Sequence, residues 1–177
     1  RRYWPDTPTR AEAERVTVAS IVVGTVDHPW LRAAVDAPGG DRVTLTGRVS
    51  LDSDPWLGDH EIAGAVLVPG AGSVELVRRA AREAGCHRIE ELTLETPLVL
   101  PPDGGVRIQV VVGVPNTSGL RPVQLYSKPE TVPGHDTAPP WTCHATGLLE
   151  TEQPPPAANA EHWPPVDADP FEVNTLY

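Results

Sequence analysis

The sequence predicts an α+β fold in which a curved antiparallel sheet wraps around a single helix. Two observations carry this prediction. Several segments alternate apolar and polar residues with the period of two that a half-buried strand requires, whereas one segment repeats its apolar residues at helical spacing. A helix that packs into the curve of a sheet can be apolar on more than one side, so one helix is enough to complete the core.

The strands are expected at four places in the middle of the chain. In residues 43–51, VTLTGRVSL, apolar side chains alternate with polar ones, and residues 106–114, VRIQVVVGV, repeat the pattern. The segments RPVQLYSK and WTCHATGLLE are further strand candidates, separated from their neighbours by glycine and proline. With five or more strands expected in all, an antiparallel sheet is the simplest arrangement.

The helix is expected in SVELVRRAAREAG, between Ser73 and Gly85. Ser73 follows two glycines and is a suitable N-terminal cap, and Gly85 is a suitable residue after the C-terminal end. The charged residues fall mostly on one face, and the apolar residues recur on the other: Val74, Val77, Ala80, Ala81 and Ala84.

The composition limits the classes of function. The chain has 177 residues and a mass of 19.0 kDa, enough for one domain with a hydrophobic core. Its formal net charge of -10 argues against nucleic acid or an anionic membrane as a partner, because both are bound through basic patches. No apolar run approaches the roughly 20 residues of a membrane span. Cys86 and Cys143 lack metal-binding spacing and are expected to be buried thiols in a reducing cytoplasm.

Three regions are expected along the chain. Residues 1–27 are polar and interrupted by proline, and they are interpreted as a leader. Residues 28–152 contain the predicted strands and helix and form the compact domain. Residues 153–177 are rich in proline and are expected to form an extended linker.

The candidate site centres on His60, which precedes the apolar segment EIAGAVLV and the helix beyond it. Pro69 is expected to end strand pairing, and Gly70 and Gly72 to allow a tight turn with an exposed backbone. The helix N-terminus offers unpaired N–H groups and a partial positive charge. A histidine beside such donors can remove a proton next to a carbonyl while the amides stabilise the oxyanion. The alternative interpretation is a structural histidine.

The stretch DHEIAGAVLVPGAGSVEL resembles the signature of the dehydratase domains of modular polyketide synthases, H-x-x-x-G-x-x-x-x-P, through His60, Gly64 and Pro69. The segments HPWL, LTGRVSLDSDPWLGDH, IEELTLETPLVLPPDGGVRIQVVVG, RPVQLYSKPE and WTCHATGLL resemble the same family in the same order. RRYW resembles the end of the linker that follows an acyltransferase domain. The resemblance therefore covers nearly the whole chain.

The resemblance implies a double hotdog fold, of which this chain would be the N-terminal half: one curved sheet around one helix. It implies dehydration of a β-hydroxyacyl chain carried on the phosphopantetheine arm of an acyl carrier protein. His60 would be the base, and Gly64, Pro69 and Gly70 would shape the loop or bind substrate. Neither a metal nor a nicotinamide cofactor is implied. Within the megasynthase the domain would form a homodimer.

The family's catalytic acid is an aspartate of the second hotdog, which the resemblance would place after Tyr177. The chain alone is therefore expected to be inactive. Glu75 lies where free-standing hotdog dehydratases carry their acid, but here it is interpreted as a relic or a structural residue. Asp59 is weighed as a group that orients His60. His28, His87, His135 and His144 are interpreted as structural or solvated residues.

The sequence is compatible with three alternatives to dehydration. A pyran-forming cyclase or an enoyl isomerase would use the same histidine on the same fold, and a degenerate hotdog would serve as a non-catalytic structural module. An intact His60, Gly64 and Pro69 pattern counts against the last of these.

Overall fold

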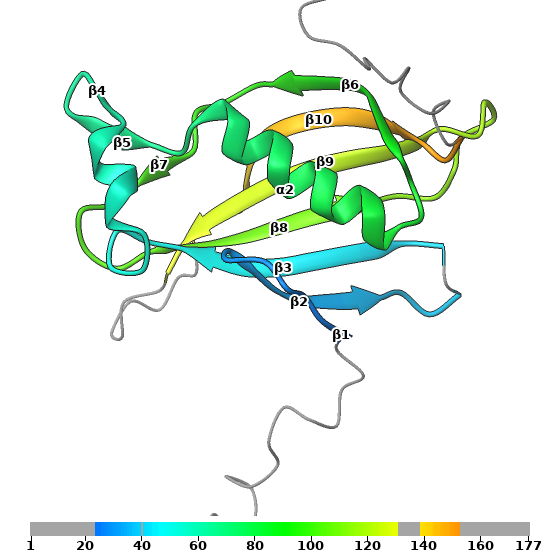
Figure 1. Cartoon of the computed structure of the whole chain (residues 1–177), viewed down its shortest axis with the longest axis horizontal. Helices are drawn as coiled ribbons and strands as arrows, with labels where there is room; N and C mark the ends of the chain where they lie inside the picture. The colour runs from blue at the N-terminus through cyan, green and yellow to red at the C-terminus, as the bar shows by residue number, and fades with distance from the viewer. Residues whose placement is uncertain (1–23, 40, 131–138, 153–177) are drawn as a thin grey trace, which may run out of the picture.

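The computed structural model describes residues 24–39, 41–130 and 139–152. These residues form a large antiparallel sheet of seven strands with one helix lying across it (Figure 1). Every neighbouring pair of strands in this sheet is antiparallel. In spatial order the strands are β1 (Gly24–Thr25), β2 (Leu31–Asp36), β3 (Val43–Val49), β8 (Val106–Val112), β9 (Arg121–Pro129), β10 (Thr142–Glu150) and β6 (Arg88–Leu94).

The four predicted strands, β3, β8, β9 and β10, are confirmed and lie side by side in the sheet. Strands β8 and β9 bury every second residue, as the period of two requires. The sheet also contains β1, β2 and β6, which were not predicted. Strand β1 lies in the last part of the range 1–27, close to the domain boundary expected at residue 28.

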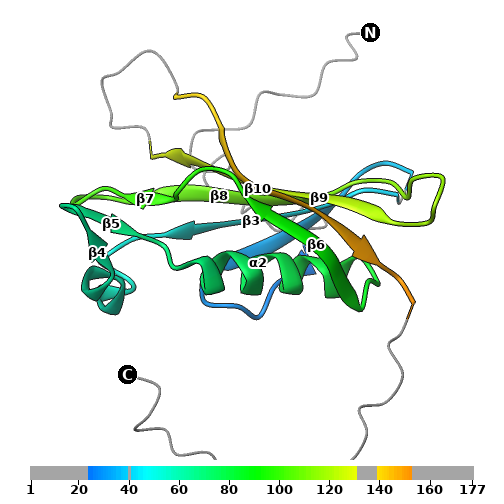
Figure 2. The ribbon, with the colours of Figure 1, turned by 90° about the horizontal axis from the view of Figure 1, so that it is seen from above.

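The helix α2 (Gly70–Glu83) lies along one face of the large sheet, on the side towards which the sheet curves (Figure 2). It contacts β3, β6, β8 and β9. Its buried residues are Ser73, Leu76, Val77, Ala80 and Ala81. Burial of one leucine or valine side chain contributes roughly 1.5–3 kcal/mol, so this face is the main reason that the helix is stable.

The helix was predicted in the right place but with the wrong start. It begins at Gly70, directly after Pro69, and Ser73 lies inside it rather than at its cap. Its other end agrees with the prediction. Gly85 follows the last helical turn with a φ of 70°, and the amides of Gly85 and Cys86 donate to the carbonyls of Arg82 and Ala81. This pair of bonds is a Schellman motif.

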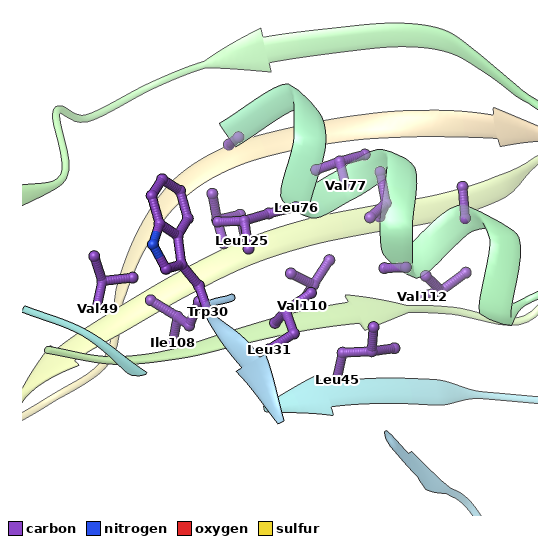
Figure 3. Packing of buried hydrophobic residues seen from close by; sticks show 14 of the residues in the cluster. Trp30, Leu31, Leu45, Val49, Leu76, Val77, Ile108, Val110, Val112 and Leu125 are labelled. Atoms are coloured by element: carbon purple, nitrogen blue, oxygen red, sulfur yellow. The ribbon is translucent and has the colours of Figure 1, made fainter. Parts of the chain in front are cut away.

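The core lies between α2 and the sheet (Figure 3). Side chains from β3, β8 and β9 point towards the helix, and Leu76 and Val77 point back at them. Fifteen residues of this core have less than 2% of their surface exposed, among them Leu31, Leu45, Ile108, Val110, Val112 and Leu125. The core therefore fixes the helix rigidly across the sheet.

A second, smaller sheet stands at one end of the molecule. It consists of β4 (Glu61–Ile62), β5 (Ala65–Leu67) and β7 (Val99–Leu100), in the order β4-β5-β7. A short 3-10 helix, η2 (Pro55–Asp59), precedes it. The small sheet lies beside the N-terminal end of α2, as Figures 1 and 2 both show.

The apolar segment after His60 is thus a hairpin of two short strands. Its two-residue loop consists of Ala63 and Gly64, with φ values of 52° and 81°. Positive φ at both central positions is the signature of a type I′ turn, whose twist matches that of paired strands. The turn reverses the chain and brings Leu67 back beside His60.

Candidate active site

The backbone of His60 is held between η2 and the hairpin. Its amide donates to the carbonyl of Leu57, which closes the last turn of η2, and its carbonyl accepts a hydrogen bond from the amide of Leu67. Leu57 is fully buried and anchors η2 in the core. The histidine is therefore held on both sides by main-chain bonds, and its half-buried side chain extends from a fixed position.

The imidazole is oriented by a main-chain carbonyl. Its Nδ1 lies 3.0 Å from the carbonyl oxygen of Leu67. A carbonyl oxygen can only accept, so Nδ1 carries the hydrogen and Nε2 keeps its lone pair when the ring is neutral. Asp59, which was weighed for this role, has an exposed side chain and makes no hydrogen bond to His60. The orienting group is the Leu67 carbonyl, which sequence reasoning did not identify.

His60 opens onto a pocket of about 340 Å³ between α2, β10 and the small sheet. The pocket wall combines apolar side chains with a few polar groups, as small-molecule sites commonly do. Its lining residues are His60, Leu67, Val68, Gly70, Ser73, Leu94, Glu95, Thr96, Pro97 and His144. The fold thus brings His60 and the start of α2 together, as the sequence predicted.

The N-terminal end of α2 lies at this pocket, with Gly70 in the wall. Pro69 precedes the helix, and its carbonyl accepts from the amides of Gly72 and Ser73. The amides of Gly70 and Ala71 have no main-chain acceptor in the described part of the chain. Because Gly70 lines the pocket, this positive end of the helix is available to a partly negative oxygen there.

Two of the four predicted site residues do not line the pocket. Gly64 lies at the tip of the hairpin, and a Cβ added there would meet no atom within 4 Å. Pro69 lies next to the pocket and starts the helix. Both shape the chain around the site rather than forming its wall. The tight turn expected at Gly70 and Gly72 is absent, because both residues belong to the first turn of α2.

Gly72 is required by packing. A Cβ at this position would lie 2.9 Å from Cζ3 of Trp30 and 3.1 Å from Cγ1 of Val68. The indole of Trp30 stacks on that of Trp56 with ring centroids 6.1 Å apart. The absence of a side chain at Gly72 therefore lets the helix start against this aromatic pair.

His144 forms part of the pocket wall and is held on both ring nitrogens. Its Nδ1 lies 2.9 Å from the carbonyl oxygen of Thr96 and donates to it, and its Nε2 lies 2.7 Å from the hydroxyl of Ser127. The side chain is only 5% exposed. Such a histidine ties β9 and β10 to the Thr96 segment, which agrees with the structural interpretation of the sequence.

Glu75 lies outside the pocket wall. Its carboxylate accepts hydrogen bonds from Arg78 at 2.8 Å and 3.1 Å, and this hydrogen bonding lowers the pKa of Glu75. A carboxyl with a lowered pKa is a poor proton donor. The carboxylate that does line the pocket is Glu95, which accepts a hydrogen bond from the hydroxyl of Thr146 at 2.7 Å. Sequence reasoning did not single out Glu95, since no local motif marks it.

The remaining histidines and cysteines divide as follows. Nδ1 of His28 accepts from the amides of Trp30 and Leu31, and the side chain of His87 is exposed.

Both cysteines are free thiols, and burial raises the pKa of each. Cys86 is buried, but Cys143 is only half-buried, so the prediction of two buried thiols was right for Cys86 alone. His135 lies outside the described residues, as do RRYW and the range 153–177.

Within residues 24–39, 41–130 and 139–152, no group of three or more His, Cys, Asp and Glu side chains is arranged to hold a metal ion. The same residues contain no helix that is long and apolar enough to span a membrane.

Comparison with known proteins agrees with this geometry. Residues 28–128 match the family model for the polyketide synthase dehydratase domain. The chain is 46% identical, over 99% of its length, to the pikromycin polyketide synthase component PikAII of Streptomyces venezuelae, of which it covers 5%. It is 40% identical, over its full length, to the mycoketide-CoA synthase of Mycobacterium tuberculosis, of which it covers 4%.

Solved structures show the same relationship. The dehydratase domain from the terminal module of the rifamycin polyketide synthase is 42% identical, with a TM-score of 0.69, and the chain covers 56% of it. The erythromycin dehydratase is 36% identical, with a TM-score of 0.75 and 58% covered. The bifunctional dehydratase-cyclase domain of ambruticin biosynthesis is 39% identical, with a TM-score of 0.70. The chain spans about half of each of the first two structures.

These matches confirm the hotdog fold, and they place the described sheet and helix in one half of a dehydratase structure. The chain belongs to the polyketide synthase dehydratase domain family, and it fits the N-terminal half of such a domain.

Proposed function

We propose that this chain supplies the catalytic base of a β-hydroxyacyl-thioester dehydratase. The observation that carries the proposal is the arrangement of His60. Its Nδ1–H is bound to the Leu67 carbonyl, so Nε2 of the neutral ring keeps the lone pair that can accept a proton, and both His60 and the start of α2 line the pocket. Membership of the dehydratase family supports the same reaction class.

In the proposed reaction, Nε2 of His60 takes the α-proton of the substrate. The electrons of the Cα–H bond form the Cα–Cβ double bond, and the Cβ–O bond breaks. The β-hydroxyl leaves as water once it receives a proton from an acid. The amides of Gly70 and Ala71, which have no main-chain acceptor among the described residues, stabilise the negative charge that develops on the thioester oxygen during proton removal.

The acid is proposed to come from the C-terminal hotdog half that completes the dehydratase structures similar to this chain. Glu75 is ion-paired away from the pocket, which argues against it as the donor. The substrate would arrive on the phosphopantetheine arm of an acyl carrier protein, and the domain would require no cofactor of its own. A homodimer and a cytoplasmic location are part of the same proposal, as is the assignment of residues 28–152 to one hotdog.

The test is substitution of His60 in a dehydratase domain that contains both hotdog halves. His60→Phe should lower turnover of a β-hydroxyacyl-pantetheine thioester by about 10²–10⁴-fold, the usual contribution of a general base. Folding should be retained, because the side chain is only half-buried. Near wild-type turnover by His60→Phe would exclude His60 as the base. Asp59→Asn is the matched control and should leave turnover unchanged, because its side chain is exposed.

The mass of the product distinguishes dehydration from the alternatives. A dehydratase converts the β-hydroxyacyl thioester into a product that has lost the mass of one water. An enoyl isomerase or a pyran-forming cyclase, given an enoyl substrate, leaves the mass of that substrate unchanged. Similarity to a dehydratase-cyclase domain keeps the cyclase as the second candidate. Residues 1–177 alone should show no turnover, and addition of the C-terminal half should restore it. Turnover by the chain alone, abolished by Glu75→Gln, would instead identify Glu75 as the acid.

A further inference from the structure

Ser73 lies in the pocket wall, and its hydroxyl makes no hydrogen bond to another described residue. It is one helical turn beyond Gly70, is only 6% exposed, and lines the same pocket as His60. No hydrogen-bond partner for this hydroxyl occurs in the described ranges, and its oxygen is not among the enclosed side-chain polar atoms that lack a partner. It therefore faces the open space of the pocket.

The local helix geometry explains why this hydroxyl is free. A serine inside a helix commonly bonds to the carbonyl four residues earlier, which here is that of Pro69. That carbonyl already accepts from the amide of Gly72 at 2.8 Å and from the amide of Ser73 at 3.4 Å. Both lone pairs of the oxygen are thus occupied by main-chain donors, and the hydroxyl is left for another acceptor.

Ser73 and Gly70 belong to the same wall of the pocket. Residues three apart lie on the same helix face, so Ser73 lies one turn after Gly70 on the face that Gly70 shares. The Cα–Cβ bonds of a helix tilt towards its N-terminus, which directs the Ser73 hydroxyl back towards the first-turn amides. An oxygen bound between Ser73 and Gly70 would lie at the positive end of the helix dipole.

We propose that the Ser73 hydroxyl donates a hydrogen bond to the thioester carbonyl oxygen of the substrate and is a further catalytic residue of this site. The inference rests on the proposed dehydration and extends it. Removal of the α-proton by His60 shifts negative charge onto the carbonyl oxygen. A donor that is already positioned next to that oxygen therefore binds the transition state more strongly than the ground state.

The first test compares Ser73→Ala and Ser73→Cys in a dehydratase domain with both hotdog halves. Loss of one such donor should lower kcat by about 10²-fold and leave KM within about twofold. Cysteine fills the space of serine but is a weak donor, so it should be as slow as alanine. Recovery of wild-type kcat by Ser73→Cys would show that Ser73 only fills space. The control is Ser118→Ala, an exposed serine before β9, which should leave both constants unchanged.

The second test measures the hydrogen bond without turnover. A β-hydroxyacyl-pantetheine thioester bound to the His60→Phe domain should show a carbonyl stretch at lower wavenumber than in water-free solvent. Addition of Ser73→Ala should move the stretch back to higher wavenumber. An unchanged stretch would overturn the inference.

The two proposals fail in different ways. If the wild-type domain releases no water from the thioester, the proposed dehydration is wrong. If the wild-type domain is active and the Ser73→Ala domain is equally active, only the inference about Ser73 is wrong.

Discussion

The Nδ1 atom of His60 lies 3.0 Å from the carbonyl oxygen of Leu67, seven residues later in the sequence and on the returning strand of a hairpin. A main-chain carbonyl cannot change its protonation state, and the hairpin and α2 fix its position. The tautomer of the proposed base is therefore set by the backbone rather than by another titratable side chain.

This relationship predicts the tautomer of His60 directly. In a ¹⁵N-labelled chain at a pH where the ring is neutral, Nδ1 should have the chemical shift of a protonated ring nitrogen and Nε2 that of an unprotonated one. The carbonyl of Leu67 stabilises this form because it only accepts hydrogen bonds. A spectrum dominated by the Nε2–H form would contradict the assigned hydrogen bond and with it the proposed base.

Alternation of apolar and polar residues predicted β3 and β8. Strand β8 is buried at Val106, Ile108, Val110 and Val112, which makes a clear period of two. Strand β6 was missed because it lies at the edge of the sheet and is mostly exposed, with charged residues between its apolar ones. Propensity and pattern respond to burial, so an edge strand leaves only a weak signal.

The site was predictable only where it is local. His60, Pro69 and Gly70 are close in sequence, and their spacing relative to the helix suggested the arrangement. The walls formed by Thr96 and His144 come from distant segments that meet through sheet pairing. The role of the Leu67 carbonyl depends on the two-residue turn at Ala63 and Gly64, which was interpreted as part of a continuous apolar segment.

The hairpin turn should tolerate asparagine but not a branched side chain. Gly64 has a φ of 81°, where a β-branched residue is strained although no neighbouring atom blocks it. Gly64→Val should lower the free energy of unfolding by about 1–2 kcal/mol. Ala63→Asn should raise it by up to about 1 kcal/mol, because Asn-Gly is the preferred pair in a type I′ turn. Urea unfolding measures both.

In the complete domain, the turnover of these hairpin variants should rank in the same order as their unfolding free energies. Gly64→Val loosens the strand that carries the Leu67 carbonyl, so turnover should fall together with hairpin stability. A Gly64→Val domain that unfolds like wild type but has lost turnover would show instead that Gly64 contacts substrate directly.

Arg121 should be a major stabilising residue. Its guanidinium donates to the carbonyls of Gly113 at 3.0 Å, Ala84 at 2.9 Å and Asp41 at 2.8 Å. It thereby joins the β8–β9 connection, the C-terminal end of α2 and the β2–β3 connection, and its charge also complements the helix dipole. Arg121→Ala should lower the free energy of unfolding by about 2–3 kcal/mol.

Arg42→Ala is the matched control for Arg121, because its side chain is exposed near the same connection. Its effect should stay within about 0.5 kcal/mol. Arg121→Lys should recover only part of the loss, since an ammonium group cannot reach three carbonyls with the geometry of a guanidinium. Equal unfolding free energies for the Arg121 and Arg42 variants would refute the role assigned to Arg121.

His28 should make stability depend on pH. Its Nδ1 accepts hydrogen bonds from the amides of Trp30 at 3.1 Å and Leu31 at 3.2 Å, which requires an unprotonated nitrogen. Burial lowers the pKa of His28 below its ordinary value, an effect that the charge of Glu75 opposes and those of Arg79 and Arg32 support. The unfolded chain therefore binds this proton more readily than the folded one.

The sign of the effect follows from that difference. The stabilisation is fully present above the unfolded pKa of about 6.5, and it is lost as pH falls from there through the lowered folded pKa. His28→Asn is the control, because its side-chain oxygen can accept from the same amides and does not titrate. The unfolding free energy of wild type relative to His28→Asn should therefore fall on acidification below about pH 6.5. Parallel curves for the two proteins, or a relative gain by wild type in acid, would show that His28 is not held neutral by these bonds.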